Sequence, residues 1–206
     1  MKYLLFILLF FFVYQNNKYI YRGLLWLLGF NIDTKSIENM PSKTIIISTH
    51  TSVHDFLIGI FVYYGYMHNK YDNYVLMKKS FEKYTNPFFY LIDKKLKLIK
   101  VEKEKSGLIN KIIDQIQYKD NYILYVSPEG TRSYIENIKS GYWTLSKEMN
   151  VDVCFFGIDF YKKTIKFEEP RKVEKYWEDE IDKFKESASK YAPLFPENCH
   201  FFNKKI

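Results

Sequence analysis

His50 and Asp55 stand five positions apart, and their side chains are of the two types that activate a hydroxyl nucleophile. A neutral imidazole can take the proton of a hydroxyl, and a carboxylate can hold the ring in the required tautomer. In an unbroken helix, residues five apart point about 140° away from each other, so contact between them requires a turn. The pair also fits a purely structural interpretation, in which Asp55 caps a helix and His50 ends a strand. The spacing alone therefore leaves both interpretations open.

A second polar cluster, Ser-Pro-Glu-Gly-Thr-Arg-Ser, occupies residues 127–133. A glycine flanked by hydroxyl side chains exposes backbone N–H groups, and the fork of Arg132 suits phosphate oxygens. Taken alone, the cluster is better explained as an ordinary turn that carries a surface arginine. The sequence has neither a Gly-x-Ser-x-Gly elbow nor a Walker-type loop, so serine hydrolase and nucleotide-driven chemistry lack support.

Both clusters follow short apolar, β-branched runs that alternate with helical patterns. Strands are predicted at residues 44–48, 74–77, 98–101, 122–126 and 151–156, and helices at residues 52–66, 106–117, 142–149 and 176–191. The alternation indicates an α/β fold in a single domain, with a mostly parallel central sheet flanked by helices. Functional residues of such sheets sit in the loops at strand ends, where both clusters fall. Residues 31–43 are polar, include Pro41, and are predicted to form a connection.

Two apolar stretches open the chain. Residues 3–14 carry no charge, and as a helix they would be about 18 Å long, against about 30 Å of hydrocarbon in a bilayer. Residues 19–30 are apolar again and include Trp26, a residue type that settles at membrane interfaces. One long helix would place the polar residues 15–18 in mid-membrane, which is costly. We therefore predict that residues 1–30 form a helical hairpin dipped into one leaflet; the alternative is a hairpin packed on the core of domain 31–206.

The composition of the chain favours some classes of binding partner over others. The 31 Lys and Arg against 24 Asp and Glu give a net charge of +7, which suits an anionic membrane surface or a phosphorylated substrate. The lysines are scattered and no nucleic-acid motif accompanies them, so nucleic acid is the least favoured partner. Cys154 and Cys199 lack metal-ligand or redox spacing and indicate a reducing compartment. We expect a membrane-associated protein with its catalytic domain on the cytoplasmic side and no metal or cofactor; the oligomeric state stays open.

Together, the His-x-x-x-x-Asp block and the Pro-Glu-Gly-Thr-Arg block resemble those of the glycerolipid acyltransferases typified by 1-acyl-sn-glycerol-3-phosphate acyltransferase. The blocks occur in the family's order, and the resemblance covers about residues 44–165. Shorter stretches that look like the short bacterial members begin at Lys139 (Lys-Ser-Gly) and at Gly157 (Gly-Ile-Asp-Phe). The ordered set is more specific than any of its blocks.

The resemblance implies a reaction and roles for particular residues. It implies that His50 is the general base, that Asp55 orients it, and that the acceptor's phosphate and glycerol part are held by Glu129, Gly130, Thr131 and Arg132. The acceptor hydroxyl would attack the thioester of acyl-CoA or acyl-carrier protein directly, without an acyl-enzyme. Backbone N–H groups near the helix start after His50 are the expected oxyanion donors. Lysophosphatidic acid or a related lysophospholipid is the expected acceptor.

Alternatives and departures from the family pattern remain. The acceptor could instead be glycerol-3-phosphate or a neutral alcohol, and a catalytically silent membrane-binding homologue is the alternative from another class. Where the family usually has Ile-Pro-Val-Asp-Arg, this chain has Ile-Lys-Val-Glu-Lys, so Lys103 would offer a point charge in place of an arginine fork. His54 stands where the family often has an aromatic residue, but the strand-end position favours His50 as the base.

Overall fold

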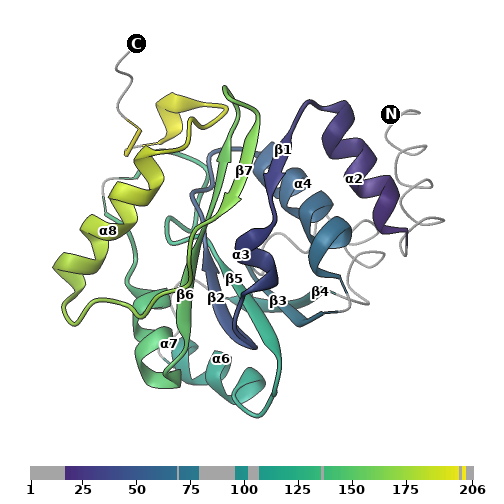
Figure 1. Ribbon diagram of the computed structural model, residues 1–206. Helices are drawn as coiled ribbons and strands as arrows, with labels where there is room; N and C mark the ends of the chain where they lie inside the picture. The colour runs from purple at the N-terminus through teal and green to yellow at the C-terminus, as the bar shows by residue number, and fades with distance from the viewer. Residues whose placement is uncertain are drawn as a thin grey trace.

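The computed structural model describes residues 17–68, 70–78, 96–101, 107–135, 137–199 and 201–202, without the side chains of residues 36, 77, 78 and 96. Within these residues a sheet of seven strands forms the middle layer (Figure 1). The strands are β1 (Asn31–Asp33), β2 (Lys43–Ile47), β3 (Asp72–Lys78), β4 (Leu96–Val101), β5 (Tyr122–Val126), β6 (Asp152–Asp159) and β7 (Thr164–Phe167). The helices are α2 (Lys18–Leu27), α3 (Lys35–Glu38), α4 (Val53–Val62), α6 (Leu108–Ile116), α7 (Gly141–Met149) and α8 (Trp177–Ser189), with a π-helical turn at Tyr63–Met67 and a 3₁₀ turn at Pro196–Asn198.

The sheet has the order β1-β7-β6-β2-β5-β3-β4, and every pair in it is parallel except β6 with β7. The predicted α/β fold with a mostly parallel sheet is confirmed. The expectation of a simple connection at residues 31–43 is wrong, because this stretch contains β1 and α3. A three-residue strand is too short to show a period in the sequence, and β1 forms at the edge of the sheet by pairing with β7.

Each face of the sheet carries its own apolar core. Alternate side chains of the central strands point to opposite faces, as Ile46 and Ile47 of β2 do. The face with Ile46 is covered by α2, α3 and α4, and the face with Ile47 by α6, α7 and α8 (Figure 1). Burial on both faces explains why β5 and the last three residues of β2 form continuous runs of apolar and aromatic residues.

Helix α2 packs one side against the domain and exposes the other. Tyr21 and Leu25 are buried, and the ring of Tyr21 stacks on that of Tyr64 with centroids 4.8 Å apart. On the opposite side Trp26 is 77% exposed and Leu27 is 74% exposed. The first arm of the predicted hairpin lies outside the described residues; α2 corresponds to the second arm. No helix in the described part of the chain combines the length and apolarity needed to cross a bilayer.

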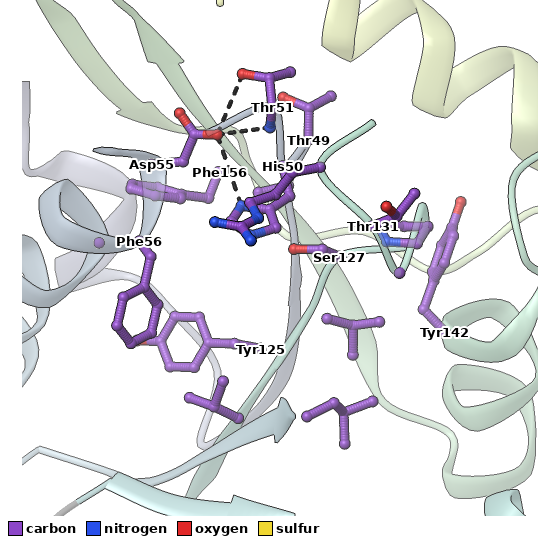
Figure 2. A pocket seen from close by; sticks show the side chains of 18 of the residues that line it. Thr49, His50, Thr51, Asp55, Phe56, Tyr125, Ser127, Thr131, Tyr142 and Phe156 are labelled. Carbon is purple, nitrogen blue, oxygen red and sulfur yellow. Dashed lines mark hydrogen bonds and ion pairs between the residues drawn. The ribbon is translucent and has the colours of Figure 1, made fainter. Parts of the chain in front are cut away.

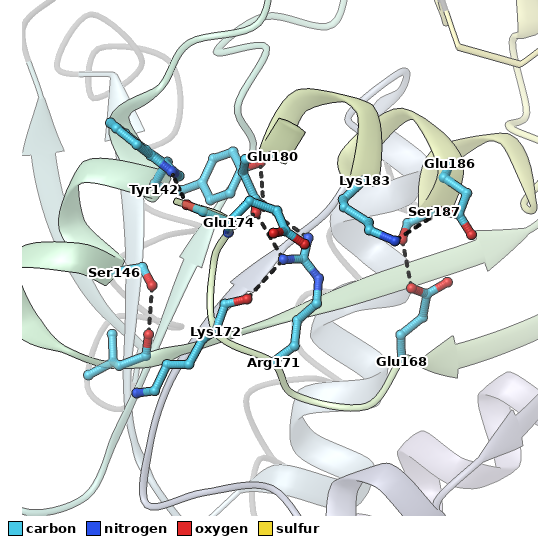
Figure 3. Close-up of polar contacts among 12 residues, drawn as sticks. Tyr142, Ser146, Glu168, Arg171, Lys172, Glu174, Glu180, Lys183, Glu186 and Ser187 are labelled. Carbon is cyan, nitrogen blue, oxygen red and sulfur yellow. Dashed lines mark hydrogen bonds and ion pairs between the residues drawn. The ribbon is translucent and has the colours of Figure 1, made fainter. Parts of the chain in front are cut away.

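A buried ion pair fixes α8 to the start of α7. The Nη1 and Nη2 atoms of Arg171 donate to the carboxylate of Glu180, each at 2.9 Å, and the Glu180 side chain is fully buried (Figure 3). The hydroxyl of Tyr142 donates to the same carboxylate at 3.1 Å, and the backbone N–H of Glu174 donates at 2.9 Å. A buried charge is tolerated only when its lone pairs are satisfied, and four donors satisfy this one.

Candidate active site

The chain turns sharply between the end of β2 and the start of α4. Strand β2 ends at Ile47 and α4 begins at Val53, with Ser52 as its N-cap. The hydroxyl of Ser52 accepts the backbone N–H of Asp55, and the Asp55 carboxylate accepts the backbone N–H of Ser52. This reciprocal capping box confirms the predicted Ser-x-x-Asp helix start. It also supplies the turn that contact between His50 and Asp55 requires.

The Asp55 carboxylate is the centre of this turn. Its Oδ2 accepts the backbone N–H groups of Thr51 and Ser52, both at 2.7 Å, and the Thr51 hydroxyl at 3.3 Å. The Nδ1 atom of His50 lies 3.7 Å from the same oxygen (Figure 2). That separation is longer than a hydrogen bond, as catalytic contacts often are before substrate binds. The backbone donors hold the carboxylate still, so it can orient the ring.

The geometry distinguishes the two neighbouring histidines. Nδ1 of His50 faces Asp55, so the tautomer with its proton on Nδ1 leaves Nε2 as the basic nitrogen. The His50 side chain is 29% exposed and lines a cavity. His54 is exposed on α4, where its ring centroid lies 6.4 Å from that of Phe195. Of these two histidines, His50 therefore has both access to the cavity and a neighbouring carboxylate.

The second block lies beside the first because β2 and β5 pair in parallel. Their register sets Ile47 opposite Val126, so the loops after both strands leave the sheet at the same edge. The N–H of Gly130 donates to the Ser127 carbonyl at 3.0 Å, and Gly130 has φ +62°, which glycine adopts without strain. This turn sends Gly130, Thr131 and Arg132 to the wall of the same cavity.

Lys139 is a site residue that the sequence did not single out. It lines the cavity together with Arg132, and a side chain at Gly130 would place its Cβ 3.2 Å from the Lys139 ammonium. Its backbone N–H donates to the Pro128 carbonyl at 3.3 Å, which holds the two segments together. The Lys-Ser-Gly stretch served only as a mark of resemblance, since a lone lysine has no spacing that predicts a role. Two cations therefore stand at the cavity wall.

Glu129 is buried behind the cavity wall. Its side chain is 8% exposed, and Oε1 accepts the backbone N–H of His50 at 3.3 Å. Oε2 has no hydrogen-bond partner among the described residues. Burial raises the pKa of Glu129 to about 7; hydrogen bonds from its own and the His50 N–H oppose the shift, and the charge of Asp55 adds to it. The predicted contact of Glu129 with the acceptor stays a prediction, whereas its contact with the His50 backbone ties the two blocks together.

The N–H groups at the start of α4 already have partners. Those of Thr51 and Ser52 donate to Asp55, that of Asp55 donates to the Ser52 hydroxyl, and that of His50 donates to Glu129. The expectation that the helix start supplies the oxyanion donors therefore fails for these four residues, because the carboxylates of Asp55 and Glu129 and the Ser52 hydroxyl accept their hydrogens.

The cavity has a volume of about 700 Å³, within the range of small-molecule sites. Its polar part lies at the ends of β2 and β5 and includes His50, Thr131 and Arg132. The rest is mostly apolar, and Figure 2 shows the rings of Phe56 and Tyr125 near His50. An apolar cavity with a few polar groups at one place suits a long hydrocarbon chain with a reactive head.

Lys103 and possible metal ligands are the remaining residues to place. Lys103, the predicted substitute for the family's arginine, lies outside the described residues. Across the parts of the chain that the structure describes, no group of three His, Cys, Asp or Glu side chains is arranged to hold a metal ion.

A family model described as Acyltransferase matches residues 31–169, which is more than half of the chain. The protein belongs to the acyltransferase family. The matched region contains β1 to β7 and both polar blocks, and it ends before α8. Among curated proteins, none matches the sequence.

Replacing His50 by alanine should lower kcat by about 10²- to 10⁴-fold, the usual contribution of a general base, while His54→Ala should keep most of the activity. His54 is the matched control because it lies four residues away and is exposed. Acyl transfer by the purified variants measures the effect, and circular dichroism checks the fold. Equal losses in two folded variants would contradict the assignment of the base.

Replacing Glu129 by glutamine should raise stability at pH 8 and change it little at pH 5. The pKa is raised from 4.5 to about 7, so over this range the folded protein keeps a proton that the unfolded chain releases. Stability therefore falls as the pH rises from 4.5 to 7, by on the order of 3 kcal/mol, and glutamine does not titrate. Urea unfolding at both pH values, with the exposed Glu197→Gln as control, tests this. Parallel pH profiles for wild type and Glu129→Gln would refute it.

Proposed function

We propose that the protein transfers a fatty acyl group from an acyl thioester to the free hydroxyl of lysophosphatidic acid or a related lysophospholipid, in phospholipid biosynthesis. The observation that carries this proposal is the His50–Asp55 pair at the polar end of a largely apolar cavity, with Arg132 and Lys139 in its wall. Family membership supports acyl transfer, and the arrangement of the cavity supports a lipid substrate with an anionic head.

The proposed reaction proceeds in one ternary complex. Nε2 of His50 takes the proton of the acceptor hydroxyl as its oxygen attacks the thioester carbonyl, and the new C–O bond forms. The C–S bond then breaks, and the imidazolium returns the proton to the leaving thiolate. Asp55 stabilises the imidazolium in between. The thiol carrier is coenzyme A or acyl-carrier protein, and the apolar wall receives the acyl chain.

The two cations favour a phosphorylated acceptor over a neutral alcohol. Arg132 offers a planar fork that can bind two phosphate oxygens, and Lys139 adds a point charge from the neighbouring segment. A neutral alcohol has no anionic group for either cation to contact. The intact pair of His50 and Asp55, together with Glu129 and Arg132, argues against a catalytically silent homologue, which need not retain them all.

We further propose that the protein binds the cytoplasmic surface of a membrane through the N-terminal segment. The exposed side of α2 supports this, because Tyr19, Trp26 and Leu27 are aromatic or apolar and face solvent. A net charge of +7 adds attraction to anionic lipids. Cys154 and Cys199 are both free thiols, as suits a reducing compartment.

Replacing Arg132 by alanine should lower kcat/KM for phosphorylated acceptors about ten- to a hundredfold, because a charge-assisted contact of about 1.5–3 kcal/mol is lost. The KM of the thioester should change little, and Arg132→Lys should recover only part of the activity. Radiolabelled acyl-CoA with a panel of phosphorylated and neutral acceptors measures both constants. An equal loss on both kinds of acceptor, or a rise confined to the acyl-CoA KM, would count against a lysophosphatidic acid acceptor.

The double variant Trp26→Glu, Leu27→Glu should bind anionic vesicles several-fold more weakly than wild type, since two carboxylates replace apolar contact area. Tyr118→Glu is the control, because Tyr118 is equally exposed but follows α6 on the other face of the sheet. Sedimentation with phosphatidylglycerol vesicles measures binding. Unchanged binding of the double variant would show that this side of α2 is not a membrane contact, and equal loss in the control would indicate a general effect of charge.

A further inference from the structure

Part of the segment that follows α8, residues 191–202, contacts the turn between β2 and α4, residues 48–52, which we call the catalytic turn. The segment lies outside residues 31–169, so the family match says nothing about it. Its described part is residues 191–199 and 201–202, and we name this part the strap. It is fixed at both ends and touches the site between them.

The first anchor of the strap is Tyr191. Its ring stacks on Phe155 of β6 with centroids 5.8 Å apart, and its hydroxyl donates to Glu168 at 3.3 Å. A Cβ at Gly157 would overlap this ring, so the glycine gives it room to lie against the strand. Next along the strap, the Ala192 carbonyl accepts the N–H of Phe160 at 2.8 Å.

The second anchor is the apolar core under α8. Phe201 is buried, and its ring meets that of Phe184 edge-on at 5.9 Å. Cys199 is buried as well, close to the two carboxyl groups of the site: burial raises the pKa of its thiol, and the charges of Glu129 and Asp55 raise it further. The strap therefore returns to the apolar core that contains Phe184 of α8.

Between the anchors, Asn198 forms a hydrogen bond to the catalytic turn. Its side-chain Nδ2 donates to the backbone carbonyl of Thr51 at 3.2 Å. Thr51 is buried, and its N–H donates to Asp55 at 2.7 Å. The residue directly after His50 is thus held through its N–H by Asp55 and through its carbonyl by the strap.

We propose that the strap is a positioning element for the catalytic turn, with Asn198 as its positioning residue. The inference rests on the proposed function of His50 and Asp55. When the Thr51 carbonyl loses its donor, the peptide can rotate and the ring of His50 is no longer held against the carboxylate. Pro193 of the strap lines the cavity, but Asn198 does not, so loss of the Asn198 contact should affect the chemical step more than substrate binding.

Three variants at one position test this proposal. Asn198→Ala removes the donor, Asn198→Asp keeps the shape without an N–H, and Asn198→Gln keeps the amide on a longer stem. Glu197→Gln is the control, because Glu197 is the exposed neighbour in the same 3₁₀ turn. We expect kcat to fall roughly three- to tenfold in the alanine and aspartate variants, as for the loss of one neutral hydrogen bond. The glutamine variant should recover part of it, with both KM values within about twofold of wild type.

The possible outcomes distinguish a positioning role of Asn198 from a role in substrate binding or in folding. An unchanged kcat in Asn198→Ala would overturn the proposal, and so would a rise in KM without a fall in kcat, since the strap would then shape the binding cavity. If circular dichroism shows that Asn198→Ala is unfolded, the aspartate and glutamine variants are compared instead. Equal kcat values in these two variants would overturn the proposal. If the wild type is active and the Asn198 variants are unaffected, only the positioning role of the strap is refuted. If the wild type is inactive on every acceptor, the proposed function is refuted as well.

Discussion

The carboxylate of Asp55 is the constraint on which the site depends. It accepts the backbone N–H groups of Thr51 and Ser52 at 2.7 Å each, and that of Ser52, the N-cap, is one that a helix N-terminus would otherwise leave unpaired. By accepting them it makes the chain reverse direction within the few residues between β2 and α4. That reversal brings His50 back toward the carboxylate that caused it. One group thus caps a helix and faces the ring of His50, so the structural and the catalytic interpretations of the motif are compatible.

A parallel sheet then joins this turn to the rest of the site. Because β2 and β5 run side by side in register, the loops after them meet at one edge. Glu129 connects the two loops by accepting the His50 N–H from a buried position. Burial of a carboxyl group is unfavourable to its charged form, and the raised pKa of Glu129 expresses that cost. The carboxyl group that connects the loops therefore keeps its proton to a higher pH than an exposed glutamate does.

The C-terminal part of the chain supports the site from outside the matched region. The ion pair of Arg171 and Glu180 holds Tyr142, which lines the cavity, through a third hydrogen bond (Figure 3). The strap acts at the other side, on the Thr51 carbonyl. Polar contacts that are buried or partly buried are strongly directional, so they define where a side chain or a peptide sits. The geometry of the proposed site therefore depends on segments outside the two motifs as well.

The α/β class, the mostly parallel sheet and the capped turn after β2 could be predicted from the sequence, because apolar periods and a Ser-x-x-Asp start are local signals. The sequence also named His50, Asp55 and Arg132 through spacing and resemblance. The burial of Glu129 and the pairing of β1 with β7 could not be predicted in this way. The same holds for the positions of Lys139 at the cavity and Asn198 at the turn. These features arise from contacts between segments far apart in the chain. No period, motif or composition of a single stretch carries that information.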